Sequence, residues 1–154
     1  MKTLLGAASL LLLFCLASPL WSLQQQCSER IAAWESIEDL PYVWGGESRE
    51  EGGVDCSGAI YNVQKKIGKP VPRTTSKKLA ILADGERKHW SEGGCGDWIW
   101  WTFSPDRPFG HVGMHINATR VWQSGSSTGP TPETLFQGGY WDRNFEVTKG
   151  LRSE

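Results

Sequence analysis

Residues 42–58 of this 154-residue chain read YVWGGESREEGGVDCSG, a glycine-rich polar loop that ends in an acidic residue, a cysteine and a serine. Apolar residues then recur at spacings of three and four: Ile60, Val63 and Ile67. This spacing predicts an amphipathic helix over 55–68, with Cys56 at its start. Unpaired backbone N–H groups and the helix dipole favour an anion there. We therefore expect a thiol with a lowered pKa that can act as a nucleophile. The other interpretation is a small buried apolar residue.

The three histidines bear on this choice, because thiol catalysis needs a base that takes the thiol proton and returns it to the leaving amine. His89 follows the charged residues 86–88, which is typical of solvated surface. His111 opens an expected strand, where its side chain can project toward a helix end. His115 shares that strand face but lies roughly 13 Å further along, so we expect a structural or surface role. The pattern favours Cys56 and His111 as nucleophile and base.

A base imidazole usually needs a third group that fixes its tautomer. Gln123 ends an expected strand, 120–123, which a tight turn at 117–119 would place antiparallel beside the expected strand 111–116. Its amide oxygen can accept a hydrogen bond from the imidazole N–H without adding charge. The alternative is an ordinary exposed strand terminus, and spacing alone does not choose between the two.

The first 22 residues have the build of a secretory signal peptide: Lys2, an apolar stretch over 4–16, then small residues. A retained membrane anchor is the competing interpretation, but the apolar stretch is shorter than the roughly 20 residues that span a bilayer. We therefore expect a signal peptide over 1–22, a single domain over 23–154, and a secreted or periplasmic product without stable membrane insertion.

Removal of the signal peptide would leave three cysteines, Cys27, Cys56 and Cys95, in a compartment that can be oxidising. An odd number means at least one unpaired thiol. If Cys56 is the reactive one, the only intramolecular bridge compatible with activity joins Cys27 to Cys95.

Composition excludes several partners. A formal net charge of −1 and a pI near 6.3 give no basic footprint for nucleic acid. Neither Cys-x-x-Cys nor His-Glu-x-x-His spacing occurs, which argues against a metal site. We expect a monomer that uses no cofactor.

The remaining pattern predicts an α+β fold. Helices are expected over 27–40, 55–68 and 75–83, and strands over 98–103, 111–116, 120–123 and 144–148. Helices first and strands second indicate N-terminal helices packed on a small antiparallel sheet. In the strand 111–116 the apolar residues alternate with the histidines, so the apolar face should meet the helices.

Six segments together resemble a known family: Tyr42-Val43-Trp44-Gly45-Gly46, Val54-Asp55-Cys56-Ser57-Gly58, Pro72-Arg73-Thr74-Thr75, Gly96-Asp97-Trp98, Gly110-His111-Val112-Gly113 and Tyr140-Trp141. In order and spacing they are similar to the NlpC family of papain-like peptidoglycan cysteine peptidases, over nearly the whole of 23–154. The resemblance implies the papain-like NlpC fold, with Cys56 as nucleophile, His111 as base and Gln123 as the third polar residue, which is histidine in many members. It also implies oxyanion or substrate-pocket positions for Tyr42, Asp55 and Ser57.

Two further residues are candidates for substrate contact. Arg73 could bind a substrate carboxylate through its planar guanidinium, or could be a surface arginine after a proline turn. Five of the nine tryptophans fall near the proposed site: Trp44, Trp98, Trp100, Trp101 and Trp122. Core packing explains most of them, and Trp44 is the candidate for a stacking wall against glycan or peptide.

The sequence therefore predicts an exported cell-wall hydrolase that cleaves amide bonds of peptidoglycan stem peptides. The Cys56 thiolate attacks the carbonyl, the Cys56 backbone N–H and the Tyr42 hydroxyl hold the oxyanion, and His111 protonates the leaving amine. Two alternatives stay open. One is a secreted module that binds wall peptides without cutting them. The other is an antibacterial toxin, or an amidase for a different substrate.

Overall fold

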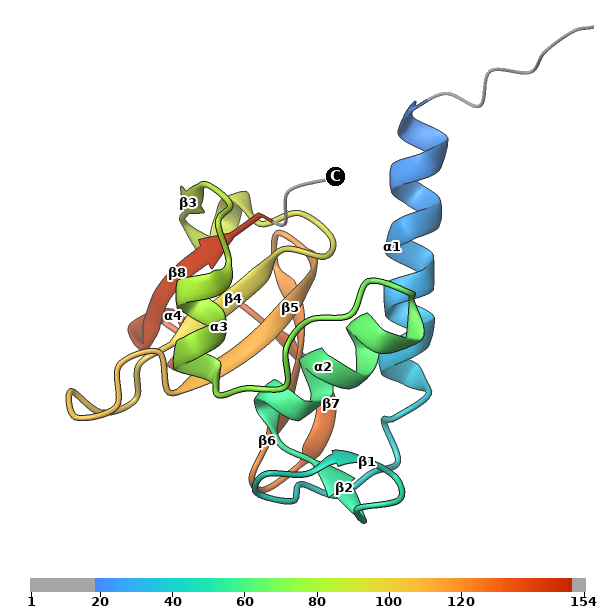
Figure 1. Cartoon of the computed structure of the whole chain (residues 1–154). Coiled ribbons are helices and arrows are strands. Elements are labelled where there is room, and N and C mark those ends of the chain that lie inside the picture. The colour runs from blue at the N-terminus through green and yellow to red at the C-terminus, as the bar shows by residue number, and fades with distance from the viewer. Residues whose placement is uncertain (1–18, 151–154) are drawn as a thin grey trace, which may run out of the picture.

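A computed structural model describes residues 19–150 (Figure 1). The expected signal peptide lies almost entirely outside these residues. Helix α1 (Pro19–Glu35) begins eight residues earlier than the expected helix 27–40, and it also ends five residues earlier. Turns that hydrogen bond Ile37 to Trp34 and Leu40 to Ile37 follow it in place of further helix. Within residues 19–150, no helix combines the length and apolar character needed to cross a membrane.

The core of the fold is a six-stranded sheet in which every neighbouring pair is antiparallel. Its strand order is β3 (Arg87–Lys88), β8 (Phe145–Lys149), β4 (Trp98–Trp101), β5 (His111–Asn117), β6 (Arg120–Gly125), β7 (Gly129–Thr134). Helices α2 (Cys56–Lys66) and α3 (Ser76–Leu82) lie on one side of this sheet (Figure 1). The predicted α+β class with an antiparallel sheet is confirmed.

Apolar side chains fill both faces of the sheet. One cluster joins the helices to the sheet through Trp34, Ile60, Val63, Val112 and Met114, all nearly inaccessible to solvent. Trp34 of α1 stacks on Trp122 of β6, with ring centroids 5.8 Å apart. A second cluster, with Trp90, Ile99, Trp101, Val121 and Leu135, lies on the opposite face. Each such buried side chain contributes about 1.5–3 kcal/mol relative to exposure.

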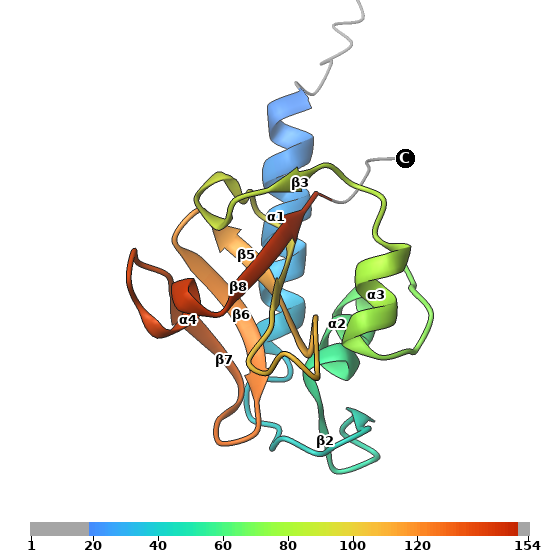
Figure 2. The same ribbon diagram turned by 90° about the vertical axis from the view of Figure 1, so that its left-hand side faces the viewer.

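The second cluster is flanked by a 3-10 turn, η1 (Trp90–Glu92), and a short helix, α4 (Tyr140–Arg143). Figure 2 shows α4 across the sheet from α3. The two faces are therefore covered by different parts of the chain, with the early helices on one side and the late connections on the other.

Side-chain caps explain where α2 and α3 begin. The Asp55 carboxylate accepts a hydrogen bond from the Gly58 N–H at 2.6 Å, and the Thr75 hydroxyl accepts one from the Lys78 N–H at 3.3 Å. Such caps satisfy N–H groups that have no partner inside the helix. Both helices start within one residue of the expected positions and end within two.

The turn at 117–119 sets the register of β5 and β6. Asn117 Oδ1 accepts hydrogen bonds from the N–H groups of Thr119 and Arg120, which closes the turn. As a result Gly113 lies opposite Gln123. The expected antiparallel pair of strands is confirmed, and each strand is slightly longer than expected.

Strand β7 and the short hairpin β1 (Glu47–Ser48) and β2 (Gly53–Val54) were not expected from the sequence. β7 contains Pro130 and Pro132, which lack a backbone N–H. It forms an edge of the sheet, where proline is tolerated. The expected strand 98–103 also ends earlier, at Trp101.

A disulfide joins Cys27 of α1 to Cys95 in the loop before β4. It closes a separation of 68 residues and leaves Cys56 as the free thiol among the described residues. This is the bridge that is compatible with a reactive Cys56.

Candidate active site

Cys56 is the first residue of α2 and its side chain is buried, 8% exposed. The backbone amides of Val112, Ser57 and Cys56 itself adjoin its sulfur and favour the thiolate form. Val112 belongs to β5 and directly follows His111. The start of α2 is therefore held against the start of β5, so that the proposed nucleophile adjoins the residue next to the proposed base.

Burial raises the pKa of the Cys56 thiol to about 11, and the neighbouring Asp55 carboxylate adds to the rise. The three N–H groups act in the opposite direction but do not offset the loss of solvation. The expectation of a lowered pKa was therefore wrong. The helix start favours the thiolate as expected, but how deeply tertiary packing buries the sulfur could not be predicted from local sequence.

The His111 imidazole is hydrogen bonded to Gln123, with 2.9 Å between Nε2 and Oε1. Because the amide oxygen only accepts, Nε2 carries the proton and Nδ1 of a neutral ring is left as an acceptor. Burial lowers the pKa of His111 to about 4, although Gln123 and Asp55 favour the charged form. Near pH 7 the site therefore holds a neutral thiol and a neutral imidazole.

Gln123 is 1% exposed, which excludes the alternative of an exposed strand terminus. Gly113, its partner on β5, has no side chain, and a Cβ there would lie 3.1 Å from the Trp101 ring. Gly113 therefore leaves room on this crowded face, between the two histidines of the strand.

Asp55 connects the glycine-rich loop to the start of α2. Oδ1 accepts hydrogen bonds from the Gly58 N–H and the Ser57 hydroxyl, at 2.6 and 2.9 Å. Oδ2 accepts one from the Gly45 N–H, at 2.9 Å. A Cβ on Gly58 would lie 2.0 Å from the Gly46 carbonyl oxygen, so glycine is required for this close approach. Asp55 and Ser57 thus fix the backbone around Cys56.

The Arg73 guanidinium is engaged by protein groups on all sides. It forms ion pairs with Glu47 at 2.9 Å and Asp55 at 3.3 Å, and it donates to the Ser57 hydroxyl at 3.0 Å. It also donates to the Gly45 carbonyl at 2.8 Å. The geometry therefore favours a role for Arg73 in positioning the loop. It does not favour the binding of a substrate carboxylate, which was the role expected from sequence. Glu47, its best-placed partner, was not identified from the sequence because it is one acid among several in a polar loop.

Tyr42 lies close enough to the nucleophile for their charges to interact. Burial, together with the negative charges of the Cys56 thiolate and the Asp55 carboxylate, raises the pKa of its hydroxyl to about 12. Tyr42 therefore remains a hydrogen-bond donor at neutral pH, as an oxyanion ligand must.

The tryptophans near the site divide into two groups. Trp98, Trp100, Trp101 and Trp122 are each less than 5% exposed and belong to the core. Trp44, beside the glycine-rich loop, is 82% exposed. Core packing thus explains four of the five, and Trp44 alone of this group is available to a ligand.

Aromatic rings also surround His111. Trp101 lies 5.5 Å away between ring centroids, Phe103 5.8 Å, and Trp141 stacks on the imidazole at 6.0 Å with an interplanar angle of 23°. Phe103 was not singled out from the sequence, since it comes from the loop after β4 and meets His111 only in the fold.

The other two histidines have structural surroundings. The His89 side chain caps η1 by accepting from the Ser91 N–H. His115 is fully buried and hydrogen bonds to both the Asn117 carbonyl and the Thr148 hydroxyl at 3.0 Å. In the part of the chain that the structure describes, His, Cys, Asp and Glu side chains form no group of three that could hold a metal ion.

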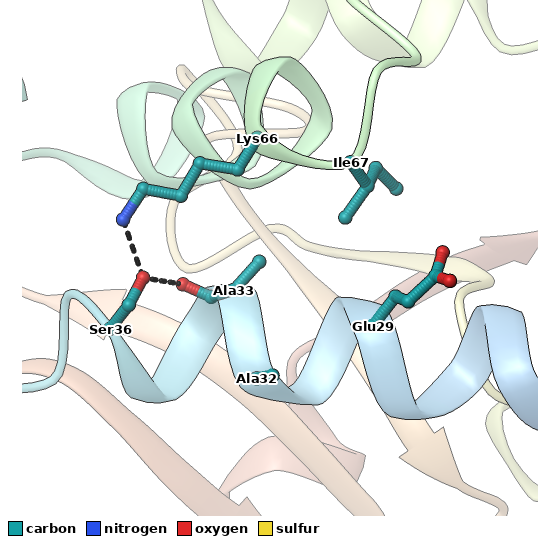
Figure 3. Close-up of a pocket in the computed structure, with 6 residues that line it drawn as sticks. All are labelled: Glu29, Ala32, Ala33, Ser36, Lys66 and Ile67. Carbon is teal, nitrogen blue, oxygen red and sulfur yellow. Dashed lines mark hydrogen bonds between the residues drawn. The ribbon is translucent and has the colours of Figure 1, made fainter.

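A surface depression between α1 and α2 is separate from this site (Figure 3). It is lined by Glu29, Ala32, Ala33, Ser36, Lys66 and Ile67. Lys66 is the last residue of α2 and Cys56 the first, so the two ends are about 15 Å apart along the helix. This depression does not contribute to the chemistry of Cys56.

Comparison with known proteins adds independent information. Residues 39–149 match the model of the NlpC/P60 family. The chain is 30% identical over 106 residues to the murein DD-endopeptidase MepH of Escherichia coli, and 30% identical over 108 residues to a gamma-DL-glutamyl hydrolase of Bacillus subtilis. The matches cover 68% and 70% of this chain but only 38% and 25% of those proteins, which are much longer.

Solved structures show the same fold. The NlpC/P60 domain of the peptidoglycan hydrolase SagA superposes with a TM-score of 0.63 at 19% identity, over 81% of this chain and 98% of that one. The peptidoglycan hydrolase RipB of Mycobacterium tuberculosis gives a TM-score of 0.64 at 21% identity, over 88% of this chain and 69% of that one.

Proposed function

The chain belongs to the NlpC/P60 family, and on that premise we propose that it is an exported peptidoglycan hydrolase that cleaves an amide bond of the stem peptide through Cys56 and His111. Relatives named as a murein endopeptidase and as peptidoglycan hydrolases support this substrate class. Export rests on residues 1–22, and N-terminal sequencing of the protein recovered from the periplasm or medium tests it. A product that still begins at Met1 would contradict export by a cleaved signal peptide.

One observation carries the proposal. The sulfur of Cys56 adjoins the backbone amide of Val112, the residue that follows His111, and the buried Gln123 accepts a hydrogen bond from Nε2 of the His111 ring. The arrangement supplies a thiol, a base with one unprotonated nitrogen and a group that fixes the tautomer, which are the parts that acyl transfer requires.

The reaction begins from neutral groups. As the Cys56 sulfur attacks the amide carbonyl, its proton moves to His111 Nδ1 and the carbonyl electrons move onto oxygen. The backbone N–H of Cys56 and the Tyr42 hydroxyl stabilise that oxyanion. The imidazolium then gives its proton to the leaving nitrogen as the C–N bond breaks. Water, deprotonated by His111, hydrolyses the thioester and restores the thiol.

Asp55, Ser57 and Arg73 hold the walls of the site in this mechanism. Their mutual hydrogen bonds join α2 to the glycine-rich loop, which carries Tyr42 and Trp44. In the proposal Trp44 contacts substrate, because its ring is exposed there.

The test is digestion of purified muropeptides by the protein comprising residues 23–154, with products identified by mass spectrometry. Wild type should release fragments that identify one cleaved amide bond, and Cys56→Ser should release none. A gamma-glutamyl polymer serves as the alternative substrate, given the name of the Bacillus subtilis relative. Binding without cleavage by wild type would overturn the proposal in favour of a wall-binding module.

A further inference from the structure

Two exposed aromatic rings lie together beside the imidazole. Phe103, in the loop after β4, is 42% exposed, and Tyr140, the first residue of α4, is 56% exposed. Their rings stack with centroids 5.5 Å apart and an interplanar angle of 16°. Large aromatic side chains are usually covered in a folded domain, so an exposed stacked pair next to a reactive site requires an explanation.

This pair is continuous with the catalytic base. Phe103 lies 5.8 Å from the His111 ring between centroids. Trp141 meets Phe103 and Tyr140 edge-on at 5.8 and 5.3 Å, and it stacks on the imidazole. The two exposed rings are thus the outer part of an aromatic surface that begins at His111.

Hydrogen bonds fix the two segments that carry these rings. Asp142 of α4 accepts from the Trp90 indole N–H at 2.6 Å and from the Gly138 N–H at 2.7 Å. In the β4–β5 loop, the Thr102 hydroxyl donates to Glu146 at 2.9 Å and accepts from the Phe109 N–H at 3.0 Å. A surface fixed in this way loses little conformational entropy on binding, which favours a binding role over an accidental exposure.

We propose that Phe103 and Tyr140 form the subsite for the leaving half of the substrate, and that they bind the aliphatic side chain of the residue that follows the scissile bond. The inference rests on the proposed function. Because His111 gives its proton to the leaving nitrogen, the leaving half must lie next to the imidazole. The Tyr42 hydroxyl lies near Cys56 instead, so the acyl half would lie on that side of the site.

The ligand class follows from the chemistry of the surface. Phe103 offers no hydrogen-bonding group, and the face of a stacked aromatic pair takes C–H groups well. An aliphatic side chain presents such groups, and so does the face of a sugar ring. We assign the aliphatic side chain, because the residue bonded to the leaving nitrogen is the part of any peptide substrate that must lie beside His111.

The experiment compares two substrates that share one acyl half. In the first substrate the leaving group is ammonia, because the scissile bond is a primary amide. In the second the leaving group is a peptide whose first residue has a long aliphatic side chain. The Phe103→Ala/Tyr140→Ala double variant should lose about tenfold in kcat/KM on the peptide, with little change on the primary amide. Tyr140→Phe should behave as wild type. Phe136→Ala, which removes a ring 62% exposed in the loop before α4, is the matched control and should change neither rate.

Equal losses of kcat/KM on both substrates would overturn the proposed subsite. They would show that the two rings support the His111 imidazole instead. No loss on either would also overturn it. A loss found only with muropeptides that carry the disaccharide would replace the aliphatic side chain by a sugar.

Binding separates this inference from the proposed function. Titration of the leaving peptide into Cys56→Ser, followed by tryptophan fluorescence, should show weaker binding when both rings are removed. Cleavage of neither substrate by wild type would defeat the proposed function, whereas ring-dependent binding of the peptide would still support the aromatic surface as its site.

Discussion

Strand β5 brings a histidine near a cysteine at each of its ends, with opposite results. At its start His111 precedes Val112, whose N–H contacts the free thiol of Cys56. Near its other end the His115 carbonyl accepts a hydrogen bond from the N–H of Gly96, directly after Cys95, which is held in a disulfide. Residue type alone therefore does not distinguish a reactive pair from a structural one.

The hydrogen bonds of the two rings make the distinction. Among residues 19–150, His111 has a side-chain hydrogen-bond partner at Nε2 only, which leaves Nδ1 available for proton transfer. Both nitrogens of His115 are occupied, Nδ1 by the Asn117 carbonyl and Nε2 by the Thr148 hydroxyl. Burial lowers the pKa of both imidazoles, so the pKa direction does not separate them. The free nitrogen does.

The largest expected effect compares the two histidines directly. His111→Ala should reduce kcat/KM on muropeptides by about 10²–10⁴-fold, the usual contribution of a general base. His115→Ala should instead lower the free energy of unfolding by about 2–4 kcal/mol, because it removes a buried side chain with two hydrogen bonds. Activity is measured per folded molecule, with the folded fraction taken from circular dichroism. A catalytic loss in His115→Ala alone would reverse our assignment of the two ends.

The second prediction compares the cysteines through pH. Since burial raises the pKa of Cys56 to about 11, little thiolate exists at pH 7 and its fraction rises about tenfold per pH unit. Alkylation of Cys56 by iodoacetamide should therefore accelerate about 100-fold from pH 7 to pH 9, with the rate read by mass spectrometry. Cys27 and Cys95 should stay unlabelled while their disulfide is intact. A fast rate that is constant across this range would indicate a thiolate–imidazolium pair instead.

Gln123 offers a smaller test of the reactive end. Gln123→Ala should reduce kcat/KM by roughly 10- to 100-fold, because the His111 tautomer would no longer be fixed. Gln123→His should retain most of the activity, since a neutral imidazole can also accept from Nε2–H. Both are compared with wild type at equal folded fraction. Wild-type activity in Gln123→Ala would show that another group orients the ring.

The smallest effect on activity is expected at the structural end. The Cys27→Ser/Cys95→Ser double variant should lose about 2–4 kcal/mol of unfolding free energy in denaturant titrations, because the bridge closes a long loop. Activity of the folded fraction should be nearly unchanged, since the disulfide lies at the His115 end. A large loss of activity without loss of stability would mean that the two ends of β5 are coupled.

Much of the site could be read from local sequence. The start of α2 follows from Asp55, whose short side chain caps the helix that carries Cys56. The Asn117 turn sets Gln123 opposite Gly113, two residues from His111 on the same strand face, because a short turn fixes which residues of two antiparallel strands lie opposite each other. Both depend on interactions between residues near one another in the chain.

Other features had no local pattern to indicate them. Strand β7 contains two prolines, which argue against a strand until its place at the sheet edge is known. The partners of Arg73 among residues 45–57 lie 16 to 28 residues away, so no spacing rule could assign its acceptors.

By itself, then, the sequence determined the class of the fold, the family resemblance, and the identities of the nucleophile and base that we propose. Tertiary structure decided how Cys56 is solvated, whether a histidine on β5 keeps a free ring nitrogen, and which aromatic rings stay exposed beside His111. The physical reason is the distance along the chain between the residues that interact. Caps and turns are set by neighbours in the chain, whereas desolvation and ring packing depend on segments that meet only after the sheet has closed against its helices.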